Sequence, residues 1–196
     1  MTRQAIRRWS LVGVAMVLAA CSPQPQQQTQ TPGTTPSANA PTAINCSAQT
    51  SHDWSAPGSQ YYMVEAEAHG PTCKEAVATI RVRARSGAVL YEKTYPVAEV
   101  PLAFNPNDDQ TGMRSDLEGW ATNAADSPSA DWLPAWPAGA EHPPFFRPVV
   151  TRQVYEGARG AQGPLFCYPD GAESNACLSM NGDHATLLGS RTPESE

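Results

Sequence analysis

Apolar and polar residues alternate along Tyr61–Ala68, which is the period of a strand with one buried face. One face takes the apolar side chains of Tyr62, Val64, Ala66 and Ala68, and the other takes the carboxylates of Glu65 and Glu67. The sequence therefore predicts a half-buried strand with an acidic outer face.

The next pattern, over Val77–Val97, predicts a β-hairpin that turns at Ser86-Gly87. A two-residue turn there pairs Ala84 with Val89, Val82 with Tyr91, Ile80 with Lys93, Arg83 with Leu90 and Arg81 with Glu92. If Tyr61–Ala68 lies beside the first arm, its glutamates meet the arginines at positions 81, 83 and 85 on the outer face. Such a row of arginines forms either an anion site or an ion-paired surface, and the neighbouring acids favour the ion pairs.

Residues 105–125 predict the main helix of the fold. Met113, Leu117, Trp120 and Ala124 recur at helical spacing, and the Asn and Asp residues before them are typical of a helix N-terminus. The same stretch partly matches a calcium loop, with Asn105, Asn107, Asp109 and Asp116 at ligand positions 1, 3, 5 and 12. Pro106 and Gln110 do not fit that loop, since it needs glycine where Gln110 stands, so helix capping explains the polar residues better.

Proline alternates with large aromatic residues over Asp131–Pro148, which excludes a regular helix or a central strand. We expect this segment to run extended over the body as a long wrap, with its aromatic side chains packed inward. The alternative is a binding patch formed by Trp132, Trp136, Phe145 and Phe146. A short helix that ends near Gly160 follows, with Val150, Val154 and Ala158 at four-residue spacing.

The C-terminal part has the strongest β pattern. The strand-like segments 164–168 and 176–180 flank a turn, which places Cys167 opposite Cys177 across a hairpin. A second hairpin follows at Asn181-Gly182, where a two-residue turn pairs Leu178 with Ala185 and Ala176 with Leu187. Three strands, a helix, the wrap, a short helix and three more strands make an α+β domain with an antiparallel sheet, or with two small sheets that share a core.

The N-terminal sequence adds a prediction of where in the cell the domain is located. Leu11–Ala20 has no charge and follows three arginines, a pattern typical of a secretory signal and too short for a membrane span. The segment Leu18-Ala19-Ala20-Cys21 resembles the lipobox of bacterial lipoproteins. The resemblance implies removal of residues 1–20 as a signal peptide and acylation of Cys21, with chains such as palmitate, as a lipid anchor. Ser22 after the cysteine implies the outer membrane of the cell envelope, with the protein facing the periplasm.

Residues 21–43 are rich in Pro, Gln, Thr and Ser and predict a disordered tether, followed by a globular domain over 44–191 and a tail over 192–196. Three of the 13 basic residues precede Cys21, so the mature chain has ten against 19 acids, a net charge of −9 compared with −6 for the whole sequence. An acidic chain without a basic, aromatic stripe excludes nucleic acid as the expected partner. The partners that we expect are the membrane, through the lipid, and a periplasmic protein.

Four cysteines remain in the predicted domain, and export places them in an oxidising compartment. We expect the bridges Cys46–Cys73 and Cys167–Cys177 among three possible pairings, because each closes a local loop. A zinc site is the alternative, but only the spacing of His69 and Cys73 fits one. Two bridges leave no thiol for catalysis, and we expect no metal or other cofactor.

The sequence has no nucleophile elbow, phosphate-binding loop, dinucleotide fingerprint or zinc-peptidase helix. Its four histidines are scattered, although a Ser-His-Asp set could still assemble in three dimensions. The segments CYPDGAESNACL and GPTCKEAVATIRVRARSGAVLY resemble small lipoproteins of Gram-negative envelopes that have no assigned function. We therefore expect a non-catalytic envelope lipoprotein with a binding or scaffolding role. The alternatives are an inhibitor of a cell-wall-degrading enzyme, similar to the disulfide-linked periplasmic lysozyme inhibitors, and an enzyme whose site the sequence hides.

Overall fold

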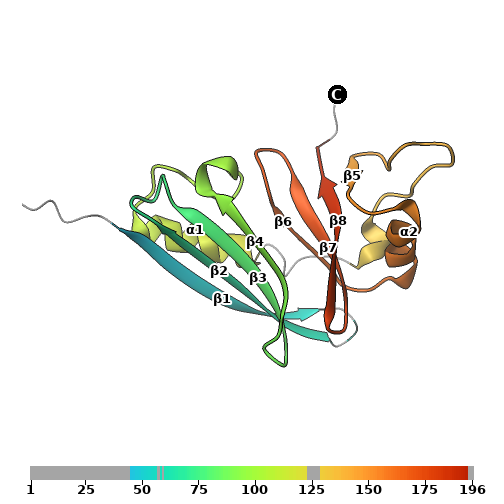
Figure 1. Ribbon diagram of the computed structural model, residues 1–196, viewed down its shortest axis with the longest axis horizontal. Coiled ribbons are helices and arrows are strands. Elements are labelled where there is room, and N and C mark those ends of the chain that lie inside the picture. Colours follow the sequence, from blue (N-terminus) through green and yellow to red (C-terminus); the bar gives the residue numbers. More distant parts are fainter. Residues whose placement is uncertain (1–44, 57, 59, 123–128, 194–196) are drawn as a thin grey trace, which may run out of the picture. The chain divides into compact units, whose positions relative to one another are not determined.

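The computed structural model describes residues 45–56, 58, 60–122 and 129–193, which all belong to one compact unit, Pro41–Glu196. They form two four-stranded antiparallel sheets and two α-helices (Figure 1). The expected α+β class is confirmed, in its two-sheet form. The predicted signal peptide, the tether with Cys21 and the last three residues of the tail lie outside the described residues. Across the described ranges, no helix combines the length and the hydropathy that a membrane span requires.

Sheet 1 consists of β1 (Cys46–Ala56), β2 (Gln60–Gly70), β3 (Val77–Ala84) and β4 (Val89–Pro96), paired in that order. The alternating segment is β2, and its apolar face is buried as predicted. The sequence pattern does not predict β1, because two of the positions on its core-facing side are Thr50 and His52, which break the apolar period.

The hairpin of β3 and β4 keeps the predicted pairs Ile80–Lys93, Arg81–Glu92 and Val82–Tyr91. A β-bulge then shifts the register, so Arg83 pairs with Val89, and the predicted pairs Arg83–Leu90 and Ala84–Val89 are wrong. The turn is longer than the two residues assumed. Gly87 supplies the left-handed backbone that this turn needs, with φ +88°.

Sheet 2 consists of β5 (Phe146–Pro148), β8 (His184–Arg191), β7 (Asn175–Asn181) and β6 (Leu165–Pro169), in that spatial order. The β7–β8 turn is centred on Gly182-Asp183 instead of Asn181-Gly182, with φ +56° at Gly182. Leu178 therefore pairs with Leu187, and the predicted pairs Leu178–Ala185 and Ala176–Leu187 are wrong. This shift of two residues leaves Leu178 and Leu187 on the predicted face, because strand side chains alternate with period two. A β-bulge between Cys177 and Leu178 then pairs Ala176 with Ser190.

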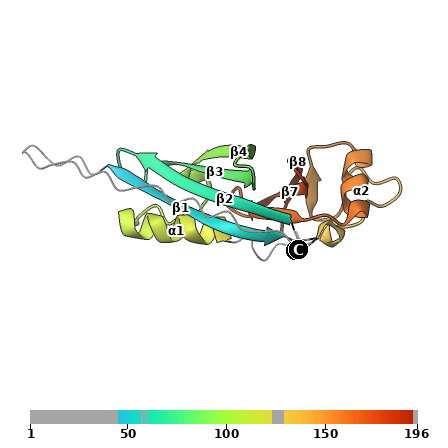
Figure 2. The same cartoon turned by 90° about the horizontal axis from the view of Figure 1, so that it is seen from below.

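Helix α1 (Gln110–Thr122) lies along β1 and β2 (Figure 2). Asp109 caps its N-terminus, since Asp109 Oδ1 accepts hydrogen bonds from the backbone N–H groups of Thr111 and Gly112, each at 2.9 Å. Met113, Leu117 and Trp120 are buried as predicted, and Ala124 lies outside the described residues. Asp116 accepts a hydrogen bond from the backbone N–H of Asn105 at 2.9 Å. These bonds explain the polar residues of the calcium-like segment.

Helix α2 (Arg152–Ala161) is the predicted short helix, and Thr151 caps it by accepting a hydrogen bond from Val154 N at 3.4 Å. The buried residue of α2 is Tyr155, whereas Val154 is 44% exposed. The residues predicted at four-residue spacing, Val150, Val154 and Ala158, therefore lie only at the edge of the buried face. Tyr155 donates a hydrogen bond to Pro134 O at 2.8 Å, which ties α2 to the chain before β5. Two short 3-10 helices are η1 (Val97–Glu99) and η2 (Ala130–Trp132).

The apolar core has two parts, one on each face of sheet 2. The larger part lies between sheet 1, α1 and one face of sheet 2, and includes Trp54, Tyr62, Trp120, Phe166 and Tyr168. The smaller part lies between α2 and the other face of sheet 2, and includes Phe146, Tyr155, Leu165 and Leu188. Sheet 2 is thus apolar on both faces, which explains the nearly continuous apolar runs in its strands.

Both predicted disulfides, Cys46–Cys73 and Cys167–Cys177, are confirmed. The first joins the start of β1 to the turn between β2 and β3. The second joins β6 to β7 at directly paired positions. Each bridge therefore closes a local loop within one sheet.

The hydroxyl groups of three tyrosines, two on β4 and one on β6, lie together beside the larger part of the core. The Tyr168 hydroxyl lies 2.6 Å from that of Tyr91 and 2.9 Å from that of Tyr95. Burial raises the pKa of all three phenols above the usual value near 10, because a phenolate would lose its hydration there.

We expect these three tyrosines to remain protonated at high pH until the protein unfolds. Above a pH of about 10 the unfolded chain loses phenolic protons while the folded chain keeps them, so the free energy of unfolding falls as the pH rises. Phenolate absorbance, followed together with circular dichroism, measures both events in one titration. Ionisation of all the tyrosines while the circular dichroism stays native would contradict this expectation.

Candidate functional site

Opposite charges pair along the outer face of sheet 1. Arg81 Nη2 lies 2.7 Å from Glu67 Oε1, and Arg83 Nε lies 2.7 Å from Glu65 Oε2. The hydrogen bond from Arg81 holds the pKa of Glu67 below its usual range. A hollow of about 490 Å³ on this face is lined by both arginines and both glutamates. Since the charges balance, the ion-paired interpretation of the arginine row is favoured over an anion site.

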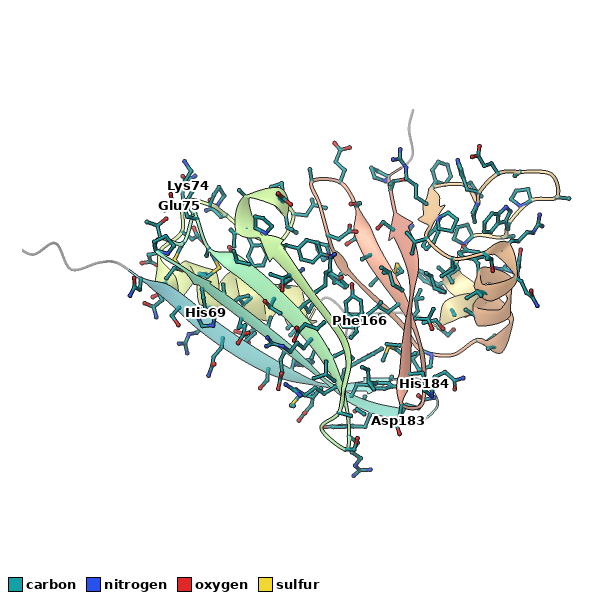
Figure 3. The ribbon with its side chains drawn as sticks, viewed as in Figure 1. His69, Lys74, Glu75, Phe166, Asp183 and His184 are labelled. Atoms are coloured by element: carbon teal, nitrogen blue, oxygen red, sulfur yellow. A yellow bond between two sulfur atoms is a disulfide. The ribbon has the colours of Figure 1, made fainter. Side chains whose placement is uncertain are left out.

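A serine, a histidine and a glutamate come together at one end of the same face. His69 Nδ1 lies 3.2 Å from Ser47 Oγ, and His69 Nε2 lies 3.7 Å from Glu67 Oε2. Figure 3 shows His69 near this end of sheet 1, with Lys74 and Glu75 beyond it. The order serine, imidazole, carboxylate is the one that serine hydrolases use.

The surroundings of this trio favour a surface hydrogen-bond network over catalysis. The His69 side chain is 59% exposed, and acyl transfer needs preorganised donors in a site that excludes water. Glu67 already pairs with Arg81 at 2.7 Å. The hollow on this face includes residues 49–51 of β1 but does not extend to Ser47 or His69.

The remaining histidines lie apart from this trio. His184 follows Asp183 at the β7–β8 turn (Figure 3), and His52 lies on β1. Among the residues that the structure describes, no three His, Cys, Asp or Glu side chains are grouped so that they could hold a metal ion.

The four aromatic residues of the predicted binding patch have different environments. Phe146 is 1% exposed and packs on Tyr155, with 5.2 Å between ring centroids. Trp136 is half-buried and also packs on Tyr155, at 5.5 Å. Trp132 is 70% exposed and Phe145 is 40% exposed. Only these last two present large aromatic surfaces to a partner.

Phe145 has an unusual backbone conformation. Its φ of +56° lies in the left-handed region, which costs a residue with a Cβ on the order of 1 kcal/mol or more. The surrounding structure maintains it, since Thr192 N donates a hydrogen bond to Phe145 O at 3.0 Å, immediately before β5 begins. Strained residues of this kind are frequent at binding sites, where the fold fixes one side chain in place.

Two hollows adjoin Phe145, with volumes of about 660 Å³ and about 550 Å³. Both are lined by Phe145, Glu173, Thr192 and Pro193, so we treat them as one feature, the rim groove. The first also includes Leu102, Ala172, Asn175 and Arg191, and the second also includes His142, Phe146, Arg147 and Ser174. Leu102, which follows η1, is itself 51% exposed. The groove therefore combines apolar surface with charges of both signs.

The charged side chains of the rim groove have no ion-pair partner among the described residues. In the described part of the chain, no ion pair within 4 Å involves Arg147, Arg191 or Glu173. This contrasts with the outer face of sheet 1, where Arg81 and Arg83 pair with glutamates. Unpaired charges around an exposed aromatic ring can attract and orient a partner with complementary charges.

The floor of the rim groove is well supported. Asp170 accepts hydrogen bonds from Ser174 Oγ at 2.7 Å and from Ser190 Oγ at 2.6 Å, which joins the β6–β7 loop to β8. The Cys167–Cys177 bridge closes the same hairpin. Gly189 lets β5 lie close to β8, since a Cβ at this position would collide with Arg147 O. Because these loops are already held in place, binding a partner there costs less conformational entropy.

No protein-family model, no curated protein and no solved structure matches this chain. Sequence reasoning identified Phe145 but missed Leu102, Arg147, Glu173 and Arg191. These residues come from distant segments, and the only local signal is the Pro143-Pro144 pair, which restricts the backbone of His142 and Pro143 just before Phe145. Cys21, the predicted acylation site, lies outside the described residues.

Proposed function

We propose that this chain is a lipid-anchored protein of the bacterial cell envelope, facing the periplasm, whose domain binds a protein partner through the rim groove and catalyses no reaction. The main support is the exposed Phe145, held in a left-handed conformation between two hollows that are lined by charged side chains of both signs. The lipobox-like segment Leu18–Cys21 supports the anchor, with Cys21 as the acylated residue. The two disulfides are consistent with export to an oxidising compartment.

The chemistry of the rim groove favours a polypeptide over a small metabolite. Sites for small molecules are mostly enclosed and apolar, with a few polar groups. The rim groove is a surface feature with an aromatic residue at its centre and charges of both signs. Aromatic and arginine side chains contribute most of the binding energy in protein–protein interfaces, which suits Phe145 and Arg191 as anchors.

Phe145→Ala is expected to weaken partner binding at least tenfold, because it removes the central apolar contact. The intact acylated protein, purified in detergent from envelopes, is used to capture the partner, which is identified by mass spectrometry. The dissociation constant is then measured with both purified proteins. Arg191→Glu is expected to have an effect of similar size through charge reversal.

Trp132→Ala is the matched control, since Trp132 is 70% exposed, more than any other aromatic residue that the structure describes, and lines neither hollow of the rim groove. Equal losses for Trp132→Ala and Phe145→Ala would contradict binding at the rim groove. Covalent labelling of Ser47 by a fluorophosphonate, absent in Ser47→Ala, would contradict the non-catalytic proposal, because it would show a reactive Ser47–His69 pair.

A further inference from the structure

The turn between β7 and β8 contains an asparagine that glycine follows, Asn181-Gly182, and both residues are exposed. Figure 3 shows this turn, marked by Asp183 and His184, beside the start of β2. An asparagine before glycine is prone to react with the next backbone nitrogen, because glycine has no Cβ to hinder the approach of that nitrogen. The turn therefore contains the reacting groups of a spontaneous modification.

The modification is an intramolecular deamidation. The backbone amide of Gly182 loses its proton to solvent base, and its nitrogen attacks the side-chain carbon Cγ of Asn181. The new N–Cγ bond replaces the Cγ–Nδ2 bond, and ammonia leaves with a proton from solvent. Water then opens the succinimide ring on either side of the nitrogen, which gives aspartate or isoaspartate at position 181. Nothing is oxidised or reduced, and water is the only co-reactant.

The fold opposes the first step of this reaction. Gly182 N donates a hydrogen bond to Gln60 Oε1 at 3.1 Å, so the proton that has to leave is held by an acceptor on β2. A hydrogen bond made by the protonated form of a group disfavours loss of the proton. The same bond limits rotation of the peptide plane between Asn181 and Gly182, which the attack on Cγ requires.

Tyr62 holds the acceptor and the turn together. Its hydroxyl contacts Gln60 Oε1 and lies 3.1 Å from Gly182 O. Tyr62 is 2% exposed and packs on Trp54 in the larger part of the core, with 5.2 Å between ring centroids. Because the tyrosine is fixed by this packing, the position of Gln60 Oε1 depends on buried structure as well as on the exposed turn.

We propose that Asn181 is a deamidation site that Gln60 keeps unreactive while the β7–β8 turn is docked on β2. The reaction proceeds when the turn separates from β2, and its product is permanent. An isoaspartate lengthens the main chain by a methylene group, which disturbs the pairing of Asn181 with His184. Deamidation thus converts a transient opening between the two sheets into a lasting change of the turn.

The test follows deamidation of the intact acylated chain in detergent at mildly alkaline pH, where hydroxide removes the amide proton. Chromatography with mass spectrometry of peptides separates asparagine, aspartate and isoaspartate at position 181. We expect the folded wild type to react more slowly than the same chain unfolded in urea. Gln60→Leu removes the acceptor and is expected to accelerate the reaction of the folded chain about two- to tenfold, the effect of one lost hydrogen bond.

Gln60→Glu is the matched control, because it keeps an acceptor oxygen at this position, and we expect it to react no faster than the wild type. Asn175, which Ala176 follows on β7, is the internal control, since the alanine Cβ hinders the attacking nitrogen. Circular dichroism of each variant measures whether the fold is retained.

Equal rates for the folded and the unfolded wild type would overturn the proposal, and this comparison needs no variant. A folded Gln60→Leu chain that reacts at the wild-type rate would overturn it as well. Equal acceleration in Gln60→Leu and Gln60→Glu, or parallel acceleration at Asn175, would show that general loosening of the hairpin controls the reaction, which contradicts the role of Gln60.

Discussion

Replacing Tyr168 with alanine is expected to lower the free energy of unfolding by about 3–5 kcal/mol, the range for removing a large aromatic side chain from a core. Tyr168 is fully buried, and its ring lies within 6.2 Å, between centroids, of the rings of Tyr91, Tyr95, Trp120 and Phe166. These rings belong to sheet 1, α1 and sheet 2. The substitution therefore weakens the packing between both sheets and the helix, which urea unfolding followed by circular dichroism measures.

Tyr168→Phe separates the ring from its hydroxyl. Phenylalanine keeps the ring contacts but leaves Tyr91 and Tyr95 without the oxygen that both contact, at 2.6 Å and 2.9 Å. We expect a loss of about 1–2 kcal/mol, typical of a buried hydrogen-bonded group. If Tyr168→Ala lost no more stability than Tyr168→Phe, the ring would not be joining the sheets as its contacts indicate.

Removing the Cys46–Cys73 bridge with two alanines is expected to lower the free energy of unfolding by about 3.5 kcal/mol at 25 °C. The Cys167–Cys177 bridge is expected to contribute about 2.7 kcal/mol by the same relation. The difference arises because the first bridge spans a sequence separation of 27 residues and the second only 10, so the first restricts the unfolded chain more.

The two double-alanine variants are controls for each other, because each removes one bridge and leaves the other intact. Denaturant unfolding under non-reducing conditions gives both values. Reduction of each variant then shows the contribution of its remaining bridge. A larger loss for the Cys167–Cys177 variant would show that local packing, and not loop length, determines the effect.

Local sequence features were sufficient to predict β2, the burial of Met113, Leu117 and Trp120 on α1, and both disulfides. In each case the residues that decide the outcome are close in sequence: the alternating apolar face of β2, the spacing of Met113 and Leu117, and cysteines that close short loops. Asp109 likewise caps the residues directly after it. Such contacts follow from chain geometry before any tertiary packing is known.

The sequence-based predictions were wrong or incomplete where tertiary contacts decide between alternative turns or strands. Asn181-Gly182 is a strong turn signal, yet the chain turns at Gly182-Asp183, which pairs Leu178 with Leu187. The Tyr62 hydroxyl donates a hydrogen bond to Gly182 O at 3.1 Å, so contact with sheet 1 contributes to the position of this turn. β1 was missed because small and polar residues dominate it, and its buried Trp54 packs on Phe166 of the other sheet.

The rim groove could not be predicted from the sequence because it combines loops from both sheets. Leu102 follows sheet 1, Glu173 lies between β6 and β7, and Arg191 ends β8. No periodic pattern links positions so far apart. The aromatic-proline segment drew attention to Phe145, but only the backbone angle and the adjoining hollows distinguish it from the buried Phe146.

The Cys46–Cys73 bridge has a mechanical consequence for a protein held from its N-terminal side. A pull on the chain before residue 45 enters the fold at Cys46, which pairs with Gly70 at the end of the β1–β2 ladder. Without the bridge, that force would separate β1 from β2 one residue pair at a time, beginning at Cys46–Gly70. With it, the load passes through the sulfur atoms to Cys73, in the turn between β2 and β3. The domain is thereby protected against peeling where a membrane tether would pull.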